Sequence, residues 1–165
     1  MSALKAARGA QWPLSAEFTF DVSTAVNDTM PTTVGNVIGG ASPVYNAAGV
    51  AIGGIATNIF EITGLPVGAA VVGGDVSVET AVVGPTASTI TVGDAASAAR
   101  YLGSTSLLAA GRTPLVPTGY RAGSTSGKNI RITVANTVAA ATAGKVTVRV
   151  LYTVAGRVSE VQAAV

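Results

Sequence analysis

The strongest constraint on the fold of this chain is an alternation of apolar and polar side chains with a period of two residues. It is clearest over residues 145–152, where Val146, Val148 and Val150 alternate with polar residues. This period places successive side chains on opposite faces of an extended strand. The sequence therefore predicts a strand over residues 145–154, and similar runs predict strands at residues 17–23, 58–63, 69–72, 75–83, 89–92 and 129–134.

Glycine and proline separate these runs and leave little room for helices. The Gly73-Gly74 pair predicts a tight hairpin turn between two strands. Residues 94–101 have the one helical pattern outside the N-terminal segment, because Asp94 can cap a helix and alanines follow it. The strands at residues 129–134 and 145–154 are predicted to pair as an antiparallel hairpin with their apolar rows facing inward.

Seven or eight short strands with one short helix indicate an all-β chain, folded as an antiparallel β-sandwich or jelly roll. Residues 1–15 lack the two-residue pattern and are predicted to form an N-terminal arm. Residues 16–165 then form a single domain, as the length of 165 residues suggests. Residues 34–54, rich in Gly, Ala, Asn and Pro, predict a long loop or irregular short strands.

The chain carries few charges for its apolar content. Apolar residues make up 48% and charged residues only 11% of the sequence, against about 25% charged residues in an ordinary soluble domain. This composition favours burial of part of the surface against other chains. The alternative is a weakly polar but soluble surface of Thr, Ser, Ala and Gly.

Several function classes are disfavoured by composition alone. The chain has no histidine and no cysteine, so it lacks the usual general base, the thiol nucleophile and the common zinc ligands. We expect no catalytic residues, no cofactor and no metal. The net charge of +2 comes from dispersed basic residues, which does not predict nucleic-acid binding. Mean hydropathy is +0.52, but proline and glycine interrupt the longest uncharged stretch, so no membrane partner is expected.

Parts of the second half resemble virion proteins of tailed bacteriophages. These segments are Arg100-Tyr101-Leu102-Gly103, Leu107-Leu108-Ala109-Ala110-Gly111-Arg112-Thr113-Pro114-Leu115, Pro117-Thr118-Gly119-Tyr120, and the terminal run from Thr142 to Tyr152 that ends at Gly156-Arg157. Over residues 70–157 their order is similar to that in capsid decoration, or cement, proteins of phage heads. The first half resembles no family in this way.

This resemblance implies a small β-rich protein on the outer surface of a phage capsid. Such proteins commonly form trimers and lock neighbouring capsomers together after the capsid expands. The implied partners are further copies of the chain, as a homotrimer, and the major capsid protein. The implied location is the capsid surface of the virion, after synthesis in the host cytoplasm. The family offers no catalytic residues to carry over.

Candidate partner-contact residues lie in the arm, in loops and on the last strand. In the arm, Trp12 is an aromatic anchor, which we expect to contact a neighbouring subunit or the capsid, although it could instead cover the chain's own core. The charged candidates are Lys5, Arg8, Arg100, Arg112, Arg121, Lys145 and Arg149. Arginine is enriched at interfaces, but solvated charges would give the same pattern in the sequence.

Two other functions remain open from the sequence. One is an adhesin module of a phage tail or fibre, which would be an elongated trimer with a ligand-binding tip. The other, less favoured, is a polysaccharide-acting enzyme that uses Glu61 and Glu79. Such an enzyme needs paired carboxyl groups in a cleft that holds a sugar. This chain has few acidic and aromatic residues with which to line such a cleft.

Overall fold

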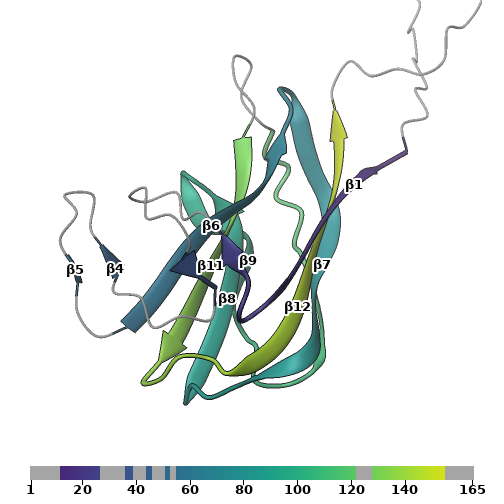
Figure 1. The fold of residues 1–165 in the computed structure, drawn as a ribbon. Helices are drawn as coiled ribbons and strands as arrows, with labels where there is room; N and C mark the ends of the chain where they lie inside the picture. Colours follow the sequence, from purple (N-terminus) through teal and green to yellow (C-terminus); the bar gives the residue numbers. More distant parts are fainter. Residues whose placement is uncertain are drawn as a thin grey trace, which may run out of the picture.

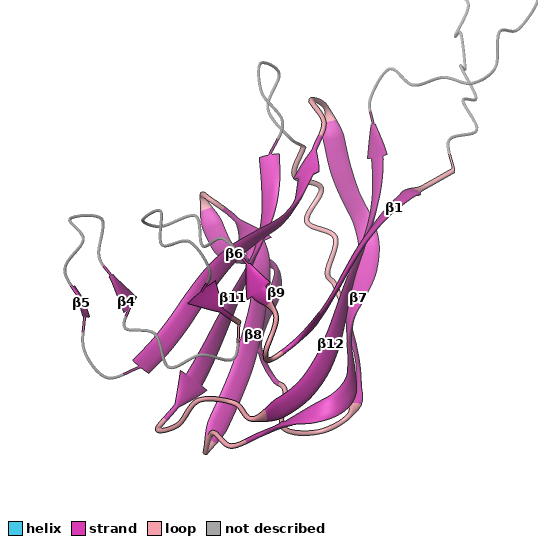
Figure 2. Cartoon of the chain, in the orientation of Figure 1, coloured by secondary structure: helices cyan, strands magenta, loops and turns pink. Residues whose placement is uncertain are grey.

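The computed structural model of this chain describes residues 12–26, 36–38, 44–45, 51–52, 55–121 and 128–154. Strands account for all the regular secondary structure of these residues, and no helix occurs among them (Figure 2). A search of the described residues finds no helix that is long and apolar enough to span a membrane. The all-β prediction is therefore confirmed for this part of the chain.

Eight strands form two antiparallel four-stranded sheets (Figure 1). The first sheet has the order β1 (Leu14–Asp21), β12 (Ala143–Val154), β7 (Ala69–Val83) and β10 (Gly111–Pro114). The second sheet has the order β6 (Ile55–Leu65), β11 (Lys128–Thr137), β8 (Ala87–Asp94) and β9 (Ser97–Ser106). Two small pairs complete the described strands: β2 (Ala25–Val26) with β3 (Asn36–Val37), and β4 (Val44–Tyr45) with β5 (Ala51–Ile52).

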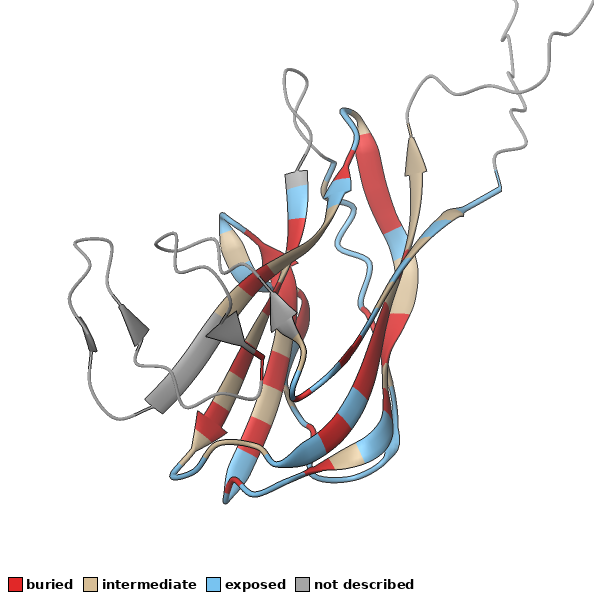
Figure 3. Cartoon of the chain, viewed as in Figure 1, coloured by how far each residue is buried: buried red, intermediate tan, exposed pale blue. Residues whose placement is uncertain are grey.

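Both sheets contribute side chains to one hydrophobic core. From β12 come Val146, Val148 and Val150, each at most 1% exposed, and from β11 come Ile130 and Ile132, which are fully buried. Figure 3 shows the resulting alternation of buried and less buried residues along the strands. The inward rows predicted from the two-residue period are thus confirmed on these two strands. Most other polar and charged strand residues lie on the outer faces, but Ser88 and Asn136 are buried and bonded to each other at 2.7 Å.

The predicted turn at Gly73-Gly74 is wrong, because β7 continues through both glycines and pairs there with β12. Gly74 has a φ of +132°, and a Cβ at this position would lie 2.1 Å from the backbone oxygen of Arg149. Glycine is needed here for a close approach between two strands and not for a reversal of the chain. The register shifts near this point, between Leu151 and Tyr152.

The predicted helix over residues 94–101 is also wrong. Residues 95–96 form a turn between β8 and β9, and Ser97 already begins β9. The Asp94 carboxylate accepts hydrogen bonds from the backbone N–H groups of Ala96 and Ser97, both at 2.9 Å. These are the contacts of a helix N-cap, but the same side chain can close a turn instead. Pairing with β8 overrides the helix propensity of the alanines.

The predicted hairpin between residues 129–134 and 145–154 does not form. β11 pairs with β6 and β8 in the second sheet, whereas β12 pairs with β1 and β7 in the first. The connection from Thr137 to Ala143 therefore crosses from one sheet to the other. A short link between two strands suggests a hairpin in sequence, but the two strands face each other across the core.

The N-terminal boundary differs slightly from the prediction. β1 begins at Leu14, which pairs with Tyr152 of β12, so two residues assigned to the arm belong to the first sheet. Residues 1–11 lie outside the described part of the chain, as do most of residues 34–54. The described pieces of the latter segment include β3, β4 and β5, in agreement with the short strands predicted there.

Candidate partner interface

Ion pairs across neighbouring strands engage most of the charged side chains that the structure describes. Each pair joins two strands that are adjacent in a sheet, and each has an N–O distance of 2.9 Å or less. The five pairs are Arg100–Asp94, Arg112–Asp75, Arg131–Glu61, Lys145–Glu79 and Arg149–Glu17. These charges therefore reinforce strand pairing and register.

A charge ladder crosses the outer face of the first sheet from edge to edge. Glu17 on β1 binds Arg149 on β12, with 2.9 Å between Oε2 and Nη2. Asp75 on β7 lies between Arg149 and Arg112, with its Oδ1 3.9 Å from Nη1 of Arg149 and 2.8 Å from Nη2 of Arg112. Asp75 is only 3% exposed, so these two guanidinium groups compensate a carboxylate that is almost removed from water.

A second polar row runs beside this ladder. Thr147 donates a hydrogen bond to Glu79 at 2.8 Å, and its hydroxyl also lies 2.8 Å from that of Thr19. The ammonium of Lys145 lies 2.7 Å from the other carboxylate oxygen of Glu79. The hydrogen bonds from Lys145 and Thr147 lower the pKa of Glu79 below its ordinary value. The row is thus a connected polar network on the sheet surface.

Asp94, Arg100 and Tyr120 form a cluster at the end of the second sheet where β8 ends and β9 begins. Asp94 is 2% exposed, and its Oδ2 accepts a 2.6 Å hydrogen bond from Nε of Arg100. The guanidinium carbon of Arg100 lies 3.8 Å from the centre of the Tyr120 ring, a cation–π contact. Burial acts to raise the pKa of Asp94, but the bonds from Arg100, Ala96 and Ser97 outweigh it and lower that pKa.

The structure describes six of the predicted interface residues, and four of these have intramolecular ion-pair partners. Arg100, Arg112, Lys145 and Arg149 are all in the ion pairs described above. Arg121 is exposed and its backbone bridges to Ala70 at the edge of the first sheet. Trp12 is 86% exposed and does not cover the core of its own chain. Lys5 and Arg8 lie outside the described residues.

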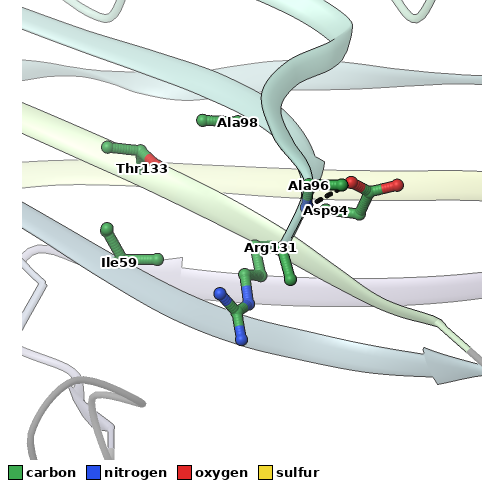
Figure 4. Close-up of a pocket in the computed structure, with 7 residues that line it drawn as sticks. Ile59, Asp94, Ala96, Ala98, Arg131 and Thr133 are labelled. Carbon is green, nitrogen blue, oxygen red and sulfur yellow. Dashed lines mark hydrogen bonds between the residues drawn. The ribbon is translucent and has the colours of Figure 1, made fainter. Parts of the chain in front are cut away.

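A small hollow of about 120 Å³ opens on the outer face of the second sheet (Figure 4). It is lined by Ile59, Asp94, Ala95, Ala96, Ala98, Arg131 and Thr133. The hydroxyl of Thr133 is buried and has no hydrogen-bond partner, whereas the Arg131 guanidinium is held by Glu61 at 2.6 Å and 2.8 Å. The lining has a single carboxylate, that of Asp94, so it offers no pair of carboxyl groups for hydrolysis.

The carboxylates considered for glycoside hydrolysis do not face each other in one cleft. Glu61 lies on β6 in the second sheet and pairs with Arg131, and Glu79 lies on β7 in the first sheet and pairs with Lys145. Among the described residues, no group of three or more Asp and Glu side chains could hold a metal ion.

Sequence analysis missed the apolar residues that project from the turns. Val83, Leu108 and Val138 are 56%, 40% and 81% exposed, and each lies in or next to a connection between strands. The turns that carry them can be recognised in the sequence, because residues 83–87, 107–111 and 138–143 contain no charged residue. Nothing in the sequence indicates the φ of +74° at Val138, a conformation that β-branched residues rarely adopt.

Comparisons with known proteins find a similarity at the level of structure. No family model matches the sequence, and no curated protein matches it. The structure is similar to a chain of the solved cyanophage Pam1 capsid asymmetric unit, with a TM-score of 0.53. The two chains are 22% identical, and the match covers 93% of this chain and 92% of the other. The likeness is one of fold.

Proposed function

We propose that this chain is a structural protein of a phage virion. In this proposal it is a decoration protein that binds the outer surface of the capsid as a homotrimer and stabilises the contacts between capsomers. The observation that carries the proposal is the similarity in fold, over nearly the whole of both chains, to a chain of a phage capsid asymmetric unit. The residues that resemble decoration proteins lie in the part of the chain from β7 to β12.

The strand order supports a jelly roll, which is a β-sandwich found in viral capsid proteins. Of the connections between the eight longer strands, only the one from β8 to β9 stays within a sheet, and every other one crosses between sheets. The orders β1–β12–β7–β10 and β6–β11–β8–β9 are those expected of two interleaved Greek keys. This architecture offers two broad sheet faces and two ends made of turns, without requiring a catalytic cleft.

The proposed mechanism is binding alone, without catalysis. The absence of histidine and cysteine from the sequence supports this, as does the pairing of Glu61 and Glu79 with cations on different sheets. Contacts that are individually modest become strong when they are repeated over a symmetric shell. A protein that bridges capsomers can then resist outward pressure through many small interfaces.

The proposal is tested with capsid shells produced from a phage that lacks the gene for this chain. Purified chain is added to the shells, which are then pelleted and heated. We expect saturable binding at a ratio set by the shell symmetry, together with a higher temperature of shell disruption. If the chain does not bind the shells and is instead found in isolated tails, the decoration role is wrong and the adhesin alternative is favoured.

A further inference from the structure

At one end of the molecule lie three turns without charged residues, which we call the turn end. It consists of residues 83–87, between β7 and β8; residues 107–111, between β9 and β10; and residues 138–143, between β11 and β12. These turns lie at the lower end of the view in Figure 1. They contain no charged residue, and their polar side chains are the two threonines Thr86 and Thr142.

Backbone hydrogen bonds join the three turns into one unit. The N–H of Thr142 donates to the oxygen of Val83 at 2.8 Å, and that of Thr86 donates to Thr137 at 3.1 Å. On the other side, the N–H of Val82 donates to the oxygen of Leu107 at 2.8 Å. Because the turns hold each other, a partner would not have to order them, which removes a main cost of binding.

The packing between two of these turns is too close for a side chain. Gly84 has a φ of +115°, and a Cβ there would lie 2.6 Å from the backbone oxygen of Ala140. The turn after β7 is therefore fixed against the one after β11. The strand orders agree with the arrangement of the three turns. In the first sheet β7 lies between β12 and β10, and in the second sheet β8 lies between β11 and β9.

Three apolar side chains project from this rigid unit. Val138 is on one flank, Leu108 is on the other, and Val83 lies between them. Val138 is 81% exposed and keeps a φ of +74°, although glycine or asparagine would adopt that backbone conformation at lower cost. Strain of this kind is frequent where function requires it. An exposed apolar side chain in a strained backbone is a poor arrangement for a surface that meets only water.

We propose that copies of this chain contact one another through the turn end. The three turns carry no charge, and Lys145, which adjoins them as Asp21 does, is already paired with Glu79. Two copies can therefore meet through the turns themselves without burying an unpaired charge or opposing like charges. The turns also offer nothing to the phosphates of nucleic acid or to an anionic membrane. The two apolar flanks of the turn end differ, so the Val138 flank of one copy can pack against the Leu108 flank of the next. The same contact then repeats around a symmetry axis, as in a closed ring.

This inference rests on the proposed function in one respect, since it assigns a surface to the self-association proposed above. It is tested on the full chain by sedimentation velocity across the micromolar range. Val138→Asn removes the apolar group but tolerates positive φ, and Leu108→Ser alters the opposite flank. We expect each variant to raise the dissociation constant of the oligomer about tenfold or more, while Val138→Asn keeps or raises the melting temperature.

The matched control is Val116→Asn, because Val116 is 62% exposed and lies beside Tyr101, away from the turn end. This variant should assemble like the wild type. The inference is overturned if the wild type is monomeric throughout this range, or if both turn-end variants assemble normally. A wild type that is monomeric but coats capsid shells would refute this inference alone, whereas turn-end assembly without shell binding would refute the proposed function alone.

Discussion

Among single residues, Asp94 combines near-complete burial with four hydrogen bonds, two from backbone N–H groups and two from Arg100. Asp94→Asn keeps an oxygen for the backbone groups but removes the charge that holds Arg100. We expect a loss of about 2 kcal/mol in the free energy of unfolding at pH 7, as for hydrogen bonds to charged groups. Urea unfolding measures this loss. Asp21→Asn, at the exposed end of β1, should leave the unfolding midpoint nearly unchanged.

The same residue predicts how stability depends on pH. The pKa of Asp94 is lowered from its ordinary value of 3.8 in the folded state. Its contribution is therefore complete above pH 3.8 and is lost as the pH falls through the lower, folded-state pKa. Urea midpoints measured from pH 6 down to pH 2 should fall less steeply for Asp94→Asn than for the wild type. Parallel curves would show that this carboxylate does not have the depressed pKa.

At the scale of the strand, Gly74 and Gly103 make a matched pair of substitutions. Gly74→Ala places a Cβ 2.1 Å from a backbone oxygen of β12 at a φ of +132°, so we expect it to cost about 3 kcal/mol or to prevent folding. Gly103→Ala meets nothing within 4 Å and should be neutral within about 0.5 kcal/mol. Thermal melting compares them, and equal melting temperatures would contradict the continuous β7 strand.

The inner row of β12 gives a second prediction at this scale. Val148 is fully buried between the sheets, so Val148→Asp should cost about 4 kcal/mol or more, because an unpaired charge enters the core. Thr153→Asp on the same strand is the control, since Thr153 is only partly buried and should lose far less. A Val148→Asp variant that melts within a degree or two of the wild type would show that this face is assigned incorrectly.

Individual strands were predictable from the sequence, but their partners were not. The two-residue period identified β1, β11 and β12 and the faces they bury, since that signal is local. The Gly73-Gly74 pair and Asp94 were misread because one local pattern fits two structures: a glycine pair serves either a turn or a close approach, and an Asp side chain caps either a helix or a turn. Which structure forms depends on the pairing of β7 with β12 and of β9 with β8. Neither pairing can be read from the local pattern.

The same limit applied to the candidate interface. Arginine and lysine positions could be read from the sequence, but their pairing with Glu17, Asp75, Glu79 and Asp94 depends on which strands are neighbours. These pairs support the sheets, while contact of the same residues with another chain stays a prediction. The uncharged turns could have been recognised in the sequence, but their assembly into one surface requires the crossing of strands between the two sheets.

For the molecule as a whole, the distribution of charge predicts the response of self-association to salt. The described charges are largely paired within the chain, and the turn end has none. Contacts between exposed charges are screened at high ionic strength, whereas apolar contacts are not. The oligomer should therefore keep or increase its affinity at about 1 M salt, as measured by sedimentation velocity. Dissociation in salt would indicate that charged residues hold the copies together.

In the proposed function the chain is a structural protein on the outside of a phage head. A cryo-electron microscopy difference map tests it most directly, between heads with this chain and heads that lack it. We predict symmetric extra density on the outer head surface that accommodates the two four-stranded sheets, with turn ends of neighbouring copies in contact. No difference on the head, or density for the chain confined to the tail, would contradict the claim.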